Sequence, residues 1–108
     1  MKLSELLRDV DVLELHAPEG LEIADVAYDS RRAAPGGVFV AVRGFDTDGH
    51  KYIGSAVGNG AACVICEEAP ACATPYVIVR DSRLALAIAS RNFFHDPSSE
   101  MTVIGVTG

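Results

Sequence analysis

Three short apolar runs constrain the fold of this chain more than any other feature of its sequence. They occupy residues 38–42, 61–66 and 76–79, and each is followed directly by a charged residue. A strand with apolar side chains on both faces must be covered on both sides, as in a parallel sheet flanked by helices. The runs therefore predict a single α/β domain with a mostly parallel sheet.

The segments between and around these runs have the spacing of helices. Apolar residues recur at helical intervals in residues 51–58 and 82–94, and Asn59-Gly60 is a pair that commonly ends a helix. A strand, a helix and a strand in succession predict a right-handed crossover between the first two runs. Weaker patterns predict a short helix at 1–8, strands near 12–15 and 22–28, and a last strand at 101–106.

The charge pattern argues against a general nucleic-acid binder. The chain has a net charge of -6, whereas nucleic-acid domains present a basic face to the phosphates. Residues 28–52 differ from the rest, because four cations outnumber three anions there: Arg31, Arg32, Arg43 and Lys51 against Asp29, Asp46 and Asp48. A local site for one compact anion fits this pattern.

Three cysteines, Cys63, Cys66 and Cys72, cannot all pair within one chain, and no signal peptide or apolar run of membrane length precedes them. We therefore expect a reducing cytoplasm. Cys63 and Cys66 form a CxxC pattern, but residues three apart on a strand point to opposite faces, which predicts buried thiols without metal or disulfide. A small redox domain is the competing hypothesis, and it predicts a strongly lowered thiol pKa at one of them.

Polar residues suited to a ligand follow two of the predicted strands. The tetrapeptide Tyr-Asp-Ser-Arg at 28–31 ends one strand, and a glycine-bracketed loop at 44–50 follows the next. The carboxyl ends of parallel strands meet at one edge of the sheet, where such folds bind ligands. Donors at this edge suit a diphosphate, and Phe45 or Tyr28 can form the wall of an apolar slot for a base.

The same residues also have structural interpretations, which the sequence leaves open. On this reading Asp29 caps the turn that follows it, with Ser30 as its partner. Arg31 then pairs with Asp29 or Asp48 and not with a phosphate, and His50 begins a helix without contacting a ligand.

Other polar residues are assigned structural roles. Asp81 or Ser82, in a second Asp-Ser-Arg tripeptide, is predicted to cap the helix at 82–94. His16 and His95 are predicted to be turn residues, and His16 is expected to be solvated.

The order of the motifs resembles one known family. Asp29-Ser30-Arg31, residues 35–44, Asp48-Gly49-His50 and the terminal Gly105-Val106-Thr107-Gly108 follow one another as in the N-terminal domain of Mur ligases. These are cytoplasmic ATP-dependent enzymes that add amino acids to the UDP-linked peptidoglycan precursor. The resemblance covers essentially the whole chain.

Within the family, the turn at 93–98 resembles that of the third ligase, UDP-N-acetylmuramoyl-tripeptide synthetase. The fourth ligase, which adds D-alanyl-D-alanine, shares the Asp-Ser-Arg and Asp-Gly-His blocks and is the alternative. A stand-alone nucleotide-sugar-binding module is a further alternative, because a fold does not fix a function.

The resemblance implies a site for the UDP end of the precursor. Ser30 is expected to contact the nucleotide through its hydroxyl. The remaining positions that the resemblance and the residue chemistry place round the uracil and the diphosphate are Tyr28, Arg31, Phe45, Asp46, Thr47 and His50. No catalytic residue and no metal ligand is expected in this part of the ligase.

The resemblance also implies the domain organisation and the ligands. Residues 1–100 are expected to form the precursor-binding domain, and 101–108 the first strand of an ATP-binding domain, with Thr107 and Gly108 starting its phosphate loop. ATP and Mg2+ are expected to serve the full-length enzyme, and neither is expected to bind to these 108 residues alone. The expected partner is UDP-N-acetylmuramoyl-dipeptide, and the protein is expected to be a monomer without nucleic acid or membrane insertion.

Overall fold

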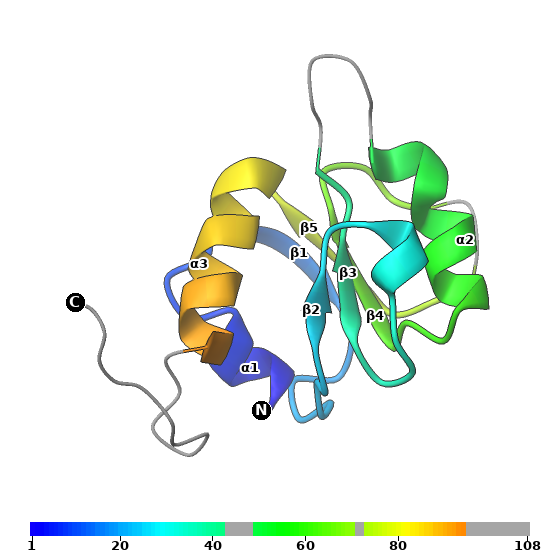
Figure 1. The fold of residues 1–108 in the computed structure, drawn as a ribbon. Helices are drawn as coiled ribbons and strands as arrows, with labels where there is room; N and C mark the ends of the chain where they lie inside the picture. The colour runs from blue at the N-terminus through cyan, green and yellow to red at the C-terminus, as the bar shows by residue number, and fades with distance from the viewer. Residues whose placement is uncertain (43–48, 71–72, 95–108) are drawn as a thin grey trace.

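A sheet of five strands lies at the centre of the part of the chain that the computed structural model describes, residues 1–42, 49–70 and 73–94 (Figure 1). The strand order is β1-β5-β4-β3-β2. β2 (Val26–Ala27), β3 (Val38–Val40), β4 (Cys63–Cys66) and β5 (Tyr76–Val79) run parallel to their neighbours, and β1 (Val12–His16) pairs antiparallel with β5. The predicted α/β domain with a mostly parallel sheet is confirmed, and the three apolar runs form its three inner strands.

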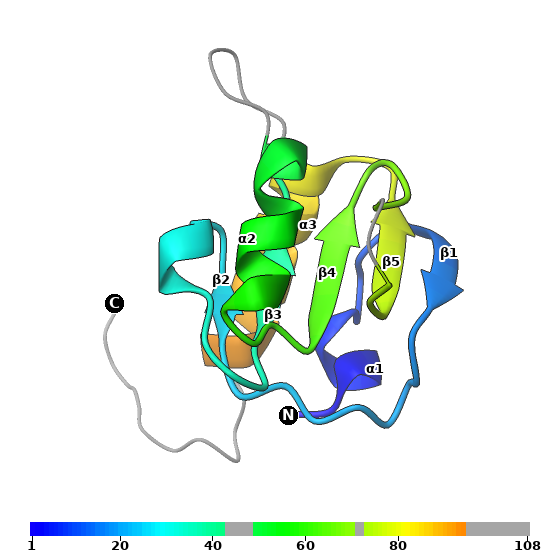
Figure 2. The ribbon, with the colours of Figure 1, turned by 90° about the vertical axis from the view of Figure 1, so that its right-hand side faces the viewer.

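Helices cover both faces of the sheet. α1 (Leu3–Leu6) and α3 (Ser82–Phe94) lie on one face, and α2 (Ile53–Gly58) lies on the other (Figures 1 and 2). There are also two short 3-10 helices. η1 (Ser30–Arg32) lies beside α2, and η2 (Gly49–Tyr52) leads directly into it. The helices predicted at 51–58 and 82–94 are therefore confirmed, and the one predicted at 1–8 is shorter than expected.

The inner strands divide their side chains between two cores. Val38 and Val40 of β3 pack in the core under α1 and α3, whereas Phe39 packs in the core under α2. Cys63 and Cys66 of β4 are divided in the same way, since Cys63 lies in the first core and Cys66 in the second. Alternation along a strand thus gives each face its own apolar layer.

Three strands are shorter than the sequence predicts, and of the run at 61–66 only Cys63–Cys66 forms β4. Of the strand expected at 22–28 only β2, Val26–Ala27, is formed, because the N–H groups of Ile23 and Ala24 donate to Met1 and Gly36 at 2.7 and 2.9 Å. The run at 38–42 pairs as a strand only to Val40.

The turn between α2 and β4 meets the turn that precedes β3. Gly60 has a φ of +104° directly after the C-cap of α2, which confirms the predicted end of that helix. Its carbonyl accepts the N–H of Gly36, which also has a positive φ, at 3.1 Å. A Cβ at Gly60 would lie only 3.0 Å from the backbone of Pro35, so two stretches of main chain meet closely here.

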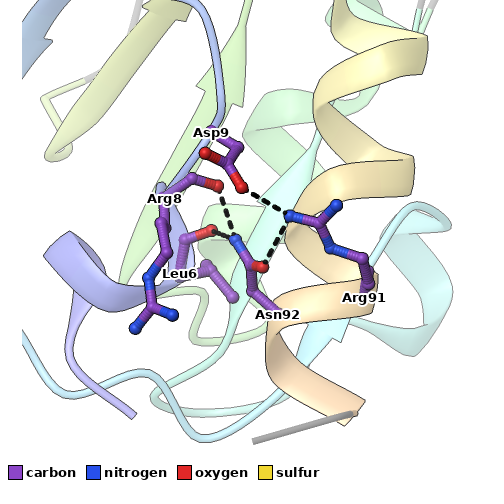
Figure 3. Close-up of polar contacts among 5 residues, drawn as sticks. All are labelled: Leu6, Arg8, Asp9, Arg91 and Asn92. Carbon is purple, nitrogen blue, oxygen red and sulfur yellow. Dashed lines mark hydrogen bonds and ion pairs between the residues drawn. The ribbon is translucent and has the colours of Figure 1, made fainter.

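A polar cluster joins α3 to the end of α1 (Figure 3). The side-chain amide of Asn92 donates to the carbonyls of Leu6 and Arg8 at 2.9 and 2.7 Å. Arg91 pairs with Asp9 at 2.9 Å, and Asp9 has a φ of +69°, a left-handed conformation that aspartate tolerates better than most residues. Asn92 therefore supplies the donors that the helix carbonyls lack.

Candidate functional site

A tight turn at the carboxyl end of β2 forms the described part of the candidate site. Asp29 Oδ1 accepts the backbone N–H of Arg31 at 3.0 Å, which is an Asx turn. The same oxygen accepts Nε–H of Arg31 at 3.1 Å, and Oδ2 accepts Nη2–H at 2.9 Å. The structure therefore supports the open alternative in which Arg31 pairs with Asp29.

This pair changes the proton affinity of both partners. The hydrogen bonds from the Arg31 side chain, and then from its backbone, hold the pKa of Asp29 below its usual value. Conversely, the Asp29 carboxylate raises the pKa of Arg31. Both groups are therefore charged at neutral pH, and Arg31 is 87% exposed and open to a ligand.

Aromatic and cationic side chains lie near this turn. Tyr28 is 69% exposed, and η1 packs beside α2, whose leading helix η2 carries Lys51 and Tyr52. The ammonium of Lys51 lies 5.6 Å from the centroid of the Tyr52 ring, and Tyr52 is close enough to Arg31 to add to the rise in its pKa. Lys51 was predicted only as one of the cations of an anion site, and Tyr52 was not predicted to belong to the site, although both follow the Asp-Gly-His block directly.

The predicted site residues are only partly described. Ser30 is the first residue of η1, and His50 is a residue of η2. Both helices contact α2, so the segments that carry Ser30 and His50 lie on the same side of the fold. The remaining predicted positions lie outside the described residues: Phe45, Asp46, Thr47, Thr107 and Gly108. The strand predicted at 101–106, Cys72 and His95 lie outside them too.

The second Asp-Ser-Arg is a helix cap, as predicted. Asp81 Oδ1 accepts the N–H groups of Arg83 and Leu84 at 3.0 and 3.2 Å. Ser82 is fully buried, and its N–H and hydroxyl both donate to Glu67 Oε2 at 2.8 Å. No local pattern pointed to Glu67, which follows β4 and meets the start of α3 only in the folded chain.

The environment of Cys63 and Cys66 contradicts the redox hypothesis. Burial raises the pKa of both thiols to about 12, whereas a reactive CxxC needs a lowered value. In the described residues no group of three or more His, Cys, Asp or Glu is placed to hold a metal ion.

We expect iodoacetamide at pH 8 to modify Cys63 and Cys66 at least about 100-fold more slowly in the folded chain than in urea, because only the thiolate reacts. The unfolded thiols ionise near pH 8.5, so the free energy of unfolding should fall as the pH rises from there toward 12. Peptide mass spectrometry measures the modification, and rapid labelling of either folded thiol would contradict the expectation.

His16 corrects a prediction. It is the last residue of β1 and not a turn residue, and its ring stacks on Tyr76 with the centroids 4.6 Å apart. Its Nε2 also lies 2.8 Å from Glu14 Oε1. The stack joins strands far apart in the sequence, so local turn signals could not predict it.

None of the helices described by the structure is long and apolar enough to cross a lipid bilayer.

The chain is similar in sequence to proteins of one known family. A family model described as "Mur ligase family, catalytic domain" matches residues 22–105.

Several curated proteins match the whole chain. Two of them are UDP-N-acetylmuramoyl-L-alanyl-D-glutamate--2,6-diaminopimelate ligases, from Chlorobium phaeobacteroides at 45% identity and from Clostridioides difficile at 38%. The chain spans 22% of the length of each.

Solved structures agree with the fold. MurF from Acinetobacter baumannii matches with a TM-score of 0.73 at 25% identity, over 90% of this chain and 21% of that one. The MurF ligase from Thermotoga maritima, solved in complex with ADP, matches with a TM-score of 0.60 at 30% identity, over 73% of this chain and 18% of that one.

Proposed function

The chain belongs to the Mur ligase family, and from that membership we propose that it is the UDP-binding, N-terminal domain of a ligase that adds the third amino acid to the peptidoglycan precursor. The observation that carries the proposal is 45% identity over the whole chain to a protein named as a diaminopimelate ligase. The substrate of the whole enzyme would then be UDP-N-acetylmuramoyl-L-alanyl-D-glutamate, and its reaction the ATP-dependent formation of an amide bond.

The length of the relatives indicates which substrates would bind outside this chain. The chain corresponds to 22% of the relative from Chlorobium, so ATP and the incoming amino acid would bind to other domains. The ADP complex of a related MurF supports a nucleotide site in the family. We place the start of the phosphate loop at Thr107 and Gly108, with Mg2+ bound beyond it. We also propose that the whole enzyme is a cytoplasmic monomer.

The turn at the end of β2 is assigned to the UDP moiety. It lies at the carboxyl edge of the sheet, where parallel sheets bind ligands, and it exposes a guanidinium that suits a phosphate. Ser30 would donate its hydroxyl to the nucleotide beside Tyr28 and Arg31. We assign Phe45, Asp46, Thr47 and His50 to the same site on the family resemblance, and no catalytic residue to this domain.

The ligase that adds D-alanyl-D-alanine is the second candidate, because the matching solved structures are MurF enzymes. The lower identity of 25% to one of them favours the first candidate. The full-length enzyme decides between them: we expect ADP release with meso-diaminopimelate as the amine and the dipeptide precursor as the acid. ADP release that requires D-alanyl-D-alanine and a tripeptide precursor would reverse the assignment.

We expect the 108-residue chain to bind UDP, and Ser30→Ala to weaken that binding about 10- to 100-fold without lowering the melting temperature. The lost interaction is one hydrogen bond to a charged or strongly polar group, which is worth about 1.5–3 kcal/mol. Calorimetric titration with UDP measures the affinity, and a thermal melt of each variant measures the stability.

Ser82→Ala is the matched control, because it changes the serine of the other Asp-Ser-Arg. Ser82 is buried against Glu67, so this variant should melt at a lower temperature and bind UDP as wild type does. Equal UDP affinity in Ser30→Ala and wild type would remove Ser30 from the site, and failure of the wild type to bind UDP would refute the proposed function.

A further inference from the structure

Asp29 holds Arg31 at two points, its backbone and its side chain. One carboxylate accepts the backbone N–H, which fixes the start of η1, and also Nε–H and Nη2–H, which fix the plane of the guanidinium. One N–H of Nη1 and the second N–H of Nη2 then form the end edge of the guanidinium, away from Asp29. That edge is presented in a fixed orientation from a side chain that is 87% exposed.

The second Asp-Ser-Arg shows what the turn alone requires. Asp81 Oδ1 accepts the N–H of Arg83 at the same 3.0 Å that separates Asp29 Oδ1 from the N–H of Arg31. There the same oxygen also accepts the N–H of Leu84 and so begins a long helix. In the first Asp-Ser-Arg, Asp29 accepts N–H groups of the Arg31 guanidinium in place of a second backbone N–H. The two identical tripeptides therefore use their aspartates differently.

Stability does not account for the Asp29–Arg31 pair. An ion pair with an exposed arginine is screened by water and contributes little to folding. A two-point contact between guanidinium and carboxylate does fix geometry, however, and a fixed donor edge binds a phosphate at a lower entropic cost.

We propose that Asp29 is a positioning residue for the diphosphate of a nucleoside diphosphate, which it serves by holding the end edge of the Arg31 guanidinium toward the phosphates. This inference rests on the proposed function and adds a residue outside the set predicted from the sequence. Asp29 itself does not contact the ligand. Its effect passes through Arg31.

The sign of one substitution separates this role from simple electrostatics. A carboxylate near a diphosphate repels it, so if charge alone mattered, Asp29→Asn would bind UDP more tightly than wild type. If Asp29 positions Arg31, the same substitution should weaken binding, because an amide keeps one acceptor for the backbone N–H but loses the charged two-point contact.

The experiment measures the dissociation constants of UDP and of uridine by calorimetry, using the 108-residue chain. Asp29→Asn is expected to weaken UDP binding about 3- to 10-fold and to leave uridine binding unchanged. In an Arg31→Ala background, Asp29→Asn should cause no further loss, because the effect requires the guanidinium. Asp81→Asn is the matched control, which should lower the melting temperature and leave both affinities as in wild type.

Three results overturn the inference. They are tighter or unchanged UDP binding by Asp29→Asn, an equal loss for uridine, and an undiminished effect in the Arg31→Ala background. In each case wild type still binds UDP and the proposed function stands. Failure of the wild type to bind UDP would remove the proposed function and this inference together.

Discussion

Phe39→Ala is expected to lower the free energy of unfolding by about 3–5 kcal/mol, the usual cost of removing a buried phenylalanine ring. Phe39 is 1% exposed and is the largest fully buried side chain in the described residues. It points from β3 into the core under α2, in the same apolar cluster as Ile53 and Val64. Since small domains are stable by only about 5–15 kcal/mol, urea denaturation should show a large shift of the midpoint.

Phe94→Ala is the matched control. The same ring is removed, but Phe94 lies at the end of α3 and is 63% exposed. Its loss should change the free energy of unfolding by no more than about 0.5 kcal/mol. Similar costs for the two substitutions would mean that the core under α2 is not packed as described.

Gly60→Ala is expected to cost about 2–4 kcal/mol. A φ of +104° is strained for any residue with a Cβ, and the new methyl group would lie 3.0 Å from the backbone of Pro35. Because the contact is with main chain, relief requires the turn between α2 and β4 to move. Thermal or urea unfolding of the variant measures the loss.

Gly54→Ala makes the same chemical change with the opposite expected sign. Gly54 lies within α2, and nothing is within 4 Å of the Cβ it would gain. Alanine is the better helix former, so this variant should gain about 0.5–1 kcal/mol. If both alanines destabilise the chain equally, the conformation at Gly60 is not the cause.

The sheet could be predicted because its signals are local. Each inner strand is a continuous apolar run, and a segment of helical spacing lies between β3 and β4. The outer strands carried weaker signals. The pairing of β1 with β5 is antiparallel and long-range. The extent of β2 depends on hydrogen bonds to the carbonyls of Met1 and Gly36, and the sequence of residues 22–28 carries no signal for these bonds.

The candidate site could be located from the sequence but not resolved. Asp-Ser-Arg occurs twice, and helical periodicity after Asp81 was enough to identify the second copy as a cap. Coordinates were needed to show that Arg31 pairs with Asp29, because the sequence allows a paired and a phosphate-binding arginine equally. Tyr52 and Glu67 were missed for a related reason, because the residues they approach, Arg31 and Ser82, are distant from them in the chain.

The order of motifs gave the family, and the fold alone would not have done so. A parallel sheet with helices on both faces serves many unrelated functions. The turn at Asp29 is assigned to UDP only because the chain is similar to named ligases. The titrations with UDP test this assignment directly.

The contact between α1 and α3 has a consequence for the way the chain is made. Asn92 lies 86 residues after Leu6, whose carbonyl it binds, and β1 pairs with β5, where Val12 lies opposite Val79. A ribosome releases the amino-terminal end first, yet β5 and then α3 emerge only after β2, β3 and β4 have been synthesised. Closing so long a loop costs entropy, and α1 and β1, although made first, cannot complete their packing until β5 and α3 have followed.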